Sequence, residues 1–229
     1  MAFLKLNVKN LKPVVVATTV LFLMFALLYF IPGVKIPHKL VFPLLTLTIA
    51  GLWVLPWQMT LAMLFSFLGD YMGTCGNFIG QMGFFALAHV WIVIFFTRRY
   101  NKLFKPKRNI NKEVAMMVGA FVILSVLMFV VRTYIKPHTP EGIIRYGVMI
   151  YASVIVLMLC MSFFQKSALF VLGATLFVFS DFILAWNKFV SPIPGEKYLI
   201  MVPYYSAQFL LFIRAIKYKV ESDKLAIRF

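Results

Sequence analysis

The stretch LAMLFSFLGDYMGTCGNFIGQMGFFALAHVWIVIFF, residues 61–96, decides the fold class of this protein. It consists of two apolar runs around a short Gly-rich turn, and each run is long enough for a membrane-spanning helix. Asp70 and His89 lie inside these runs, and Asp181 has a similar position in GATLFVFSDFILAW, residues 173–186. A charged side chain in hydrocarbon costs about 3 kcal/mol or more, so it usually faces a partner or a water-filled cavity. We interpret the remaining chain as the scaffold that brings these three side chains together.

The composition excludes a soluble globular domain. Of the 229 residues, 62% are hydrophobic and only 13% are charged, and the mean hydropathy is +0.91. A soluble domain has about a quarter of charged residues. The apolar blocks are about 17 to 22 residues long, which is the length of helix that crosses a hydrocarbon core of ~30 Å. They lack the alternation of barrel strands. The sequence therefore predicts an all-α polytopic membrane protein.

Eight transmembrane helices in a single domain, residues 1–229, account for the apolar blocks. The first block is predicted to be an uncleaved span because it is too long for a signal peptide and no cleavage site precedes Pro32. Prolines are expected at helix boundaries, and Pro56 separates the second span from the third. The predicted spans are about 13–32, 39–56, 57–76, 78–97, 113–131, 142–163, 167–186 and 197–217.

The positive charge predicts the orientation of these spans. With eight spans, sixteen of the 23 Lys and Arg residues lie on the side that holds both termini, and the loop RRYNKLFKPKRNINK, residues 98–112, contributes most of the excess. Positive residues concentrate on the cytoplasmic side, so we expect both termini in the cytoplasm. We also expect these loops to contact anionic lipid headgroups rather than nucleic acid. A bacterial inner membrane is the predicted location.

Further polar residues lie near the three ionisable ones. Ser66 precedes Asp70 by one helical turn, and Ser180 directly precedes Asp181, so we interpret the two serines as partners of the aspartates. An ordinary buried polar role, satisfied by neighbouring side chains or backbone, is the alternative for each acid and for His89. Interfacial anchoring is the alternative for the tyrosines of the last span. The other candidates are a polar patch in the last span, formed by Tyr204, Tyr205 and Gln208, and two arginines. Arg132 and Arg145 lie at the outer ends of the fifth and sixth spans, where we expect them to contact headgroups or hold a phosphate.

Several of these segments together resemble a known family. The runs LGD (68–70), GQMGFFALAH (80–89), GATLFVFSDFILA (173–185) and YYSAQ (204–208) resemble the YhhN family of membrane proteins, in the same order and with similar spacing. The resemblance extends from about residue 40 to 215. It implies an eight-helix fold and a lysoplasmalogenase-like ether hydrolase, which cleaves the vinyl ether bond of a lysophospholipid substrate. The products are a fatty aldehyde and a glycerophospho-ethanolamine or -choline.

The acids suit this chemistry on independent grounds. Vinyl ethers hydrolyse by proton transfer to carbon, followed by capture of an oxocarbenium ion by water. One carboxyl must then be protonated and the other ionised, and burial in apolar surroundings favours the neutral form of a carboxyl. Asp70 and Asp181 are the predicted catalytic pair, in either order, with His89 or Tyr204 orienting one of them or the water. This chemistry requires no metal and no cofactor. The alternative is a transporter that uses the two acids as a proton or cation relay.

Overall fold

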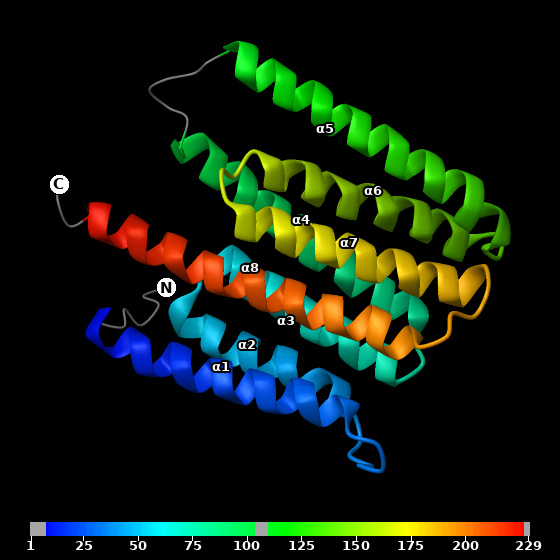
Figure 1. Ribbon diagram of the computed structural model, residues 1–229, viewed down its shortest axis with the longest axis horizontal. Helices are drawn as coiled ribbons and strands as arrows, with labels where there is room; N and C mark the ends of the chain where they lie inside the picture. The colour runs from blue at the N-terminus through cyan, green and yellow to red at the C-terminus, as the bar shows by residue number, and fades with distance from the viewer. Residues whose placement is uncertain (1–7, 104–109, 227–229) are drawn as a thin grey trace. The chain divides into compact units, whose positions relative to one another are not determined.

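The computed structural model of the protein describes residues 8–103 and 110–226. Within these two ranges it contains eight α-helices and no strand, which confirms the predicted all-α fold for this part of the chain (Figure 1). The helices are α1 (Val8–Phe30), α2 (Phe42–Val54), α3 (Trp57–Thr74), α4 (Phe78–Leu103), α5 (Ile110–Val130), α6 (Ile143–Phe163), α7 (Ala168–Phe189) and α8 (Glu196–Ala226). Short 3-10 or π turns, η1 (Lys39–Val41), η2 (Val131–Ile135) and η3 (Lys136–His138), precede α2 and follow α5.

Most helix ends agree with the prediction, and the break at Pro56 is confirmed. Helix α2 ends at Val54, Leu55 is extended, and Pro56 caps the start of α3. The residue before a proline is pushed out of the helical region, which explains the break. Two helices extend beyond the spans predicted for them, residues 78–97 and 197–217. Helix α4 continues to Leu103 and α8 to Ala226, so the first part of the predicted basic loop is helical.

Six helices of the described residues are long and apolar enough to cross a membrane: α1, α4, the helix that contains α5 with its following turns, α6, α7 and α8. Helices α2 and α3 fall outside this group. Helix α2 with its preceding turn is a shorter apolar helix, Lys39–Val54, and α3 contains Gly69, Asp70 and Gly73 near its end. The number of spans is therefore supported for six of the eight predicted helices, and the orientation of the termini stays a prediction.

The chain divides into two compact units, which we describe separately. One unit comprises residues 1–91 and 211–229, and the other comprises residues 92–210. The division falls within α4 and within α8, so each of these helices contributes to both units. The organisation as a single domain stays a prediction.

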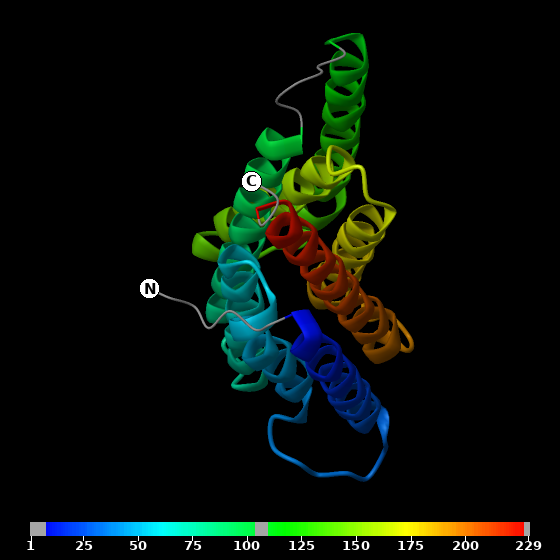
Figure 2. The same cartoon turned by 90° about the vertical axis from the view of Figure 1, so that its left-hand side faces the viewer.

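In the first unit, consecutive helices pack against each other. Helices α1 and α2 lie side by side in both views, and the rings of Phe25 and Phe42 are 5.4 Å apart (Figures 1 and 2). Helices α2 and α3 are tied across the break at Pro56, because the Thr60 hydroxyl donates a hydrogen bond of 2.9 Å to the Gly51 carbonyl. From the end of α8, the ammonium of Lys219 donates to the carbonyl of Trp53, which is one of the last carbonyls of α2.

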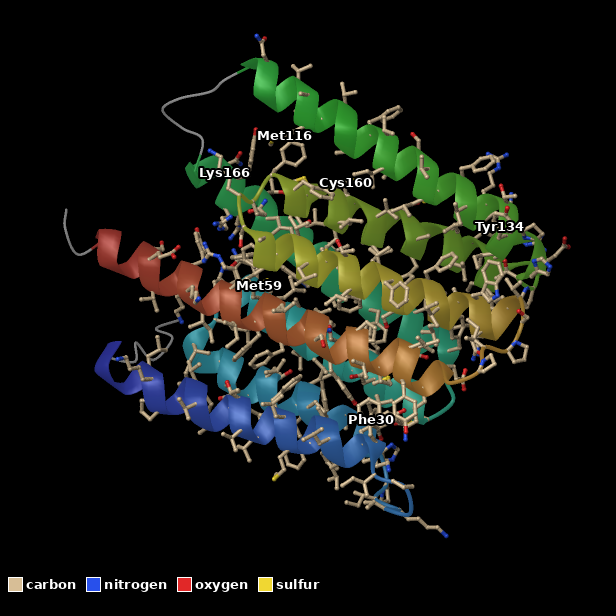
Figure 3. The ribbon with its side chains drawn as sticks, in the orientation of Figure 1. Phe30, Met59, Met116, Tyr134, Cys160 and Lys166 are labelled. Atoms are coloured by element: carbon tan, nitrogen blue, oxygen red, sulfur yellow. The ribbon has the colours of Figure 1, made fainter. Side chains whose placement is uncertain are left out.

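In the second unit, α5, α6 and α7 follow each other as antiparallel neighbours (Figure 1). The thiol of Cys160 on α6 lies toward α5, where it donates to the carbonyl of Ala120 at 3.2 Å (Figure 3). At the other end, the ring of Tyr134 in η2 lies 6.0 Å from Trp186 of α7. The short turn between α6 and α7 makes these two helices a hairpin.

Candidate functional site

The first group of predicted site residues lies on α3 and the first half of α4. Asp70 is 3% exposed, Ser66 is 1% exposed and His89 is fully buried. Uncompensated burial of such groups is costly, so residues of this kind are usually held by polar partners. Their burial agrees both with a site and with the alternative of ordinary buried polar groups.

Ring and glycine contacts define how α3 packs against α4. Trp57 lies 5.1 Å from Trp91, and Phe65 stacks on Phe84 at 6.2 Å. A Cβ atom placed on Gly69 would lie only 3.1 Å from the ring of Phe85, so the absence of a side chain allows this approach. The contacts are those of an antiparallel pair. In this register Ser66 lies between the levels of Asp70 and His89.

His89 has a defined ring orientation. Its Nδ1 lies 2.7 Å from the carbonyl of Phe85, one turn earlier on the same helix. A carbonyl oxygen only accepts hydrogen bonds, so Nδ1 carries the proton and Nε2 of the neutral ring is an acceptor. An imidazole held in this way can orient a water molecule or an acid proton through Nε2.

The second group of predicted site residues lies on α7 and the first part of α8. Asp181 is half-buried, and the hydroxyl of Tyr151 on α6 donates a hydrogen bond to its Oδ2. Sequence reasoning missed Tyr151. A signal was present, because residues equally distant from the short turn between two antiparallel helices lie at the same level. Counting outward from residues 164–167 pairs Tyr151 with Ser180, which is within one residue of the level of Asp181.

Ser180 does not pair with Asp181, contrary to the prediction. Its hydroxyl donates to the carbonyl of Ile200 on α8 at 2.9 Å. Neighbouring residues of a helix point about 100° apart, so Ser180 faces α8 while Asp181 faces α6. The adjacency of the two residues in the sequence concealed this difference.

The aromatic residues of α8 pack against the same stretch of α7. Tyr204 and Tyr205 are buried, and the ring of Tyr204 meets that of Phe177 edge-on at 5.4 Å. Phe177 precedes Asp181 by one turn, so Tyr204 lies about one turn from the level of the acid. Gln208 is fully buried about two turns beyond Ile200 on α8, which places it farther from the level of Asp181 than Tyr204.

The two arginines of the predicted site have different environments. Arg132 is exposed in η2. Arg145 is bound within the turn that precedes α6: its Nη2 donates to the Thr139 carbonyl at 2.8 Å, and its Nη1 pairs with the carboxylate of Glu141 at 3.0 Å. Arg145 therefore has a structural role in holding this turn, whatever else it contacts.

A further arginine is buried although it belongs to the predicted basic loop. Arg99, which is 4% exposed, lies in the last part of α4 and donates from Nη1 to the backbone carbonyl and, at 3.1 Å, to the side-chain oxygen of Gln165. Gln165 in turn donates to the carbonyl of Phe96. The expected headgroup contact is therefore wrong for Arg99, because the helix continues and turns this side chain inward.

Each unit brings some of the predicted site residues together. The first unit groups Asp70, Ser66 and His89 on one helix pair, and the second groups Asp181 with Tyr204 and adds Tyr151. The assembly of both groups into one site stays a prediction. Six of the described helices are long and apolar enough to cross a membrane, which places the protein in the class of α-helical membrane proteins, and one of these six, α7, contains Asp181.

Comparison with known proteins identifies the family. The YhhN family model matches residues 14–215, so the chain belongs to the YhhN family. A shorter segment is similar to lysoplasmalogenase TMEM86B of Rattus norvegicus, with 47% identity over 45 residues, or 20% of this chain and 19% of the relative. The protein of the same name from Homo sapiens is 44% identical over 45 residues, or 20% of each chain. That of Sus scrofa is 51% identical over 39 residues, or 17% of each chain.

The matched segment spans about a fifth of the length of these curated relatives. No solved structure matches this chain.

Proposed function

We propose that this protein is a membrane-embedded hydrolase that cleaves the vinyl ether bond of lysoplasmalogen. Membership of the YhhN family and the similarity to proteins named lysoplasmalogenase support the reaction class. The structural observation that carries the proposal is the pair of acids inside apolar helices, with Asp70 almost fully buried and Asp181 hydrogen-bonded from Tyr151.

The proposed reaction uses one carboxylic acid and one carboxylate. The acid transfers a proton to the vinyl carbon that is not bound to oxygen, which gives an oxocarbenium ion. The carboxylate stabilises this cation and helps to activate the water that attacks it. The resulting hemiacetal loses the glycerophospho group as an alcohol and leaves a fatty aldehyde. The net reaction consumes one water molecule, and the proton lost by that water restores the acid.

The remaining predicted residues have supporting roles in this proposal. His89 accepts through Nε2 and orients the water or the acid proton. Tyr204, packed on Phe177, borders the level of Asp181 and forms a wall for the alkenyl chain. Exposed Arg132 is suited to the phosphate of the headgroup, because a guanidinium matches phosphate oxygens. Arg145 contributes by holding the turn beside it.

The test is aldehyde release from defined lysoplasmalogen by the purified protein in detergent. We expect Asp70→Asn and Asp181→Asn each to lower kcat by about a hundredfold or more, since acid–base groups typically contribute 10²–10⁴. The matched control is Glu221→Gln, the same chemical change at a carboxylate that is 59% exposed on α8, and it should behave as wild type.

Three results would contradict the proposal. Wild-type protein that is folded and releases no aldehyde from either the ethanolamine or the choline substrate would overturn the enzyme assignment. Ion flux in proteoliposomes that depends on Asp70 and Asp181, without lipid turnover, would establish the transporter alternative instead. Full activity in both variants would show that the acids are ordinary buried polar groups.

A further inference from the structure

The hairpin of α6 and α7 contains a polar contact that the predicted mechanism does not use. The Tyr151 hydroxyl donates to Oδ2 of Asp181, and both residues lie near the middle of their helices. A tyrosine at a membrane boundary serves as an anchor, whereas a tyrosine in mid-span needs a partner for its hydroxyl. In this hairpin that partner is one oxygen of the acid, which leaves Oδ1 of Asp181 for another contact.

The surroundings of this contact are apolar. Ala152 and Ile155 on α6 and Phe177 on α7 are buried near it. In such surroundings a hydrogen bond is stronger than in water, and its loss leaves a polar atom that water does not easily replace. A carboxyl held by one strong hydrogen bond therefore has a restricted rotation about its Cβ–Cγ bond.

The backbone that carries Asp181 is held as well. Ser180 ties α7 to α8 through the carbonyl of Ile200, and Phe177 packs on Tyr204 one turn away. These contacts set the rotation of α7 about its own axis, while Tyr151 sets the orientation of the carboxyl group. The helix and the side chain are thus positioned by different partners, on α8 and on α6.

We propose that Tyr151 is a positioning residue, which holds the carboxyl of Asp181 with Oδ1 directed toward the reacting vinyl ether. This inference rests on the proposed function, because it assigns Asp181 to the chemical step. A carboxyl that must meet the reacting carbon or the attacking water at a defined distance works efficiently only when its orientation is fixed before the substrate binds.

The test is the Tyr151→Phe variant, which keeps the ring and removes only the hydroxyl. Loss of this hydrogen bond corresponds to a fall in kcat of about tenfold if the carboxyl is neutral and up to about a hundredfold if it is ionised, and we expect KM to stay within about twofold of wild type. The matched control is Tyr146→Phe on the same helix, where the side chain is 73% exposed, and it should have wild-type kcat. Binding of a saturated alkyl-ether lysolipid, which lacks the vinyl group, should be unchanged in both variants.

A double-mutant cycle separates positioning from simple structural support. If Tyr151 acts through Asp181, adding Tyr151→Phe to Asp181→Asn should lower the residual rate no further, measured as single-turnover aldehyde release. If Tyr151→Phe does not fold, replacement of Tyr151 by 3,5-difluorotyrosine keeps the shape and alters only the hydroxyl. In that case a change of more than twofold in kcat at constant KM is the expected result.

The outcomes are distinguishable. An active wild type with normal kcat in Tyr151→Phe, or in the fluorinated protein, overturns the positioning role and leaves the proposed function intact. If the two substitutions lower the rate independently, so that their effects multiply in the double mutant, the positioning role is also overturned. A wild type that releases no aldehyde overturns the proposed function and, with it, this inference.

Discussion

The α3–α4 pair and the α6–α7 hairpin each carry an acid inside an apolar segment, but the residue before the acid makes a different kind of contact in each. The residue before Asp70 is Gly69, whose missing side chain lets the ring of Phe85 approach the backbone. The residue before Asp181 is Ser180, which hydrogen-bonds to α8, and the acid itself is hydrogen-bonded by Tyr151. The first acid thus lies beside a contact made by close packing, and the second lies among contacts made by hydrogen bonds. We expect substitutions to affect the two regions by different mechanisms.

The largest effect is expected from filling the space beside Gly69. In Gly69→Val the new side chain would overlap the ring of Phe85, so the two helices must separate, and we expect a loss of about 1–3 kcal/mol in the free energy of unfolding. Thermal denaturation in detergent would measure the change. The matched control is Gly83→Val on α4, where nothing lies within 4 Å of the added Cβ. Equal stability of the two variants would show that close packing at Gly69 is unimportant.

A smaller effect is expected from removing the hydroxyl of Ser180. Ser180→Ala deletes one hydrogen bond between α7 and α8, and the net contribution of such a bond is about 1 kcal/mol. The control is Ser153→Ala, since Ser153 is exposed and its hydroxyl donates at 2.9 Å to the carbonyl of Met149 in its own helix, with only a long contact of 3.9 Å to the sulfur of Met128 on α5. If the two alanine variants unfold at the same temperature, the bond to Ile200 does not hold α7 in place. A fall in kcat for Ser180→Ala at unchanged KM would show that the hydrogen bond to Ile200 also supports the chemical step.

The smallest effect is expected at Gly73, one turn after Gly69. A Cβ there would lie 2.8 Å from the side-chain amide of Gln81, which is the mobile end of a long side chain and can move away. Alanine also favours the helix over glycine by about 1 kcal/mol. We therefore expect Gly73→Ala to unfold within about 0.5 kcal/mol of wild type by the same assay. A loss as large as that of Gly69→Val would mean that Gln81 is held rigidly and that the glycine contact extends over both turns.

Much of the fold could be predicted because its causes are local. The length and apolarity of each block determine where a helix forms, and Pro56 ends one helix before the next begins. Helices extend beyond the predicted spans where the composition changes gradually. Arg98 and Arg99 looked like the start of a basic loop, although arginine is a good helix former and α4 continues through both.

The candidate site could be predicted as a set of residues and less well as a set of contacts. Asp70, His89 and Asp181 stood out because ionisable groups are rare in apolar segments. The partner of Asp181 was assigned to Ser180 because the two are adjacent, whereas the structure gives Tyr151. Counting from the turn between α6 and α7 would have placed Tyr151 within one residue of the level of Asp181, since level in a hairpin depends on distance from the turn, but the rotation of α7 was needed to show that Asp181 rather than Ser180 faces it.

The sequence by itself determined that this protein is helical and belongs in a membrane, together with the approximate position of each helix and the unusual acids within them. These properties depend on composition over one segment at a time. Only the tertiary structure decided which way each helix is rotated, and therefore that Asp181 faces Tyr151, Ser180 faces Ile200 and Arg99 faces Gln165. In a soluble helix one apolar stripe reveals the rotation, but these helices are apolar on nearly all sides. Their rotation is determined by the packing of many side chains from neighbouring helices, which no single segment encodes.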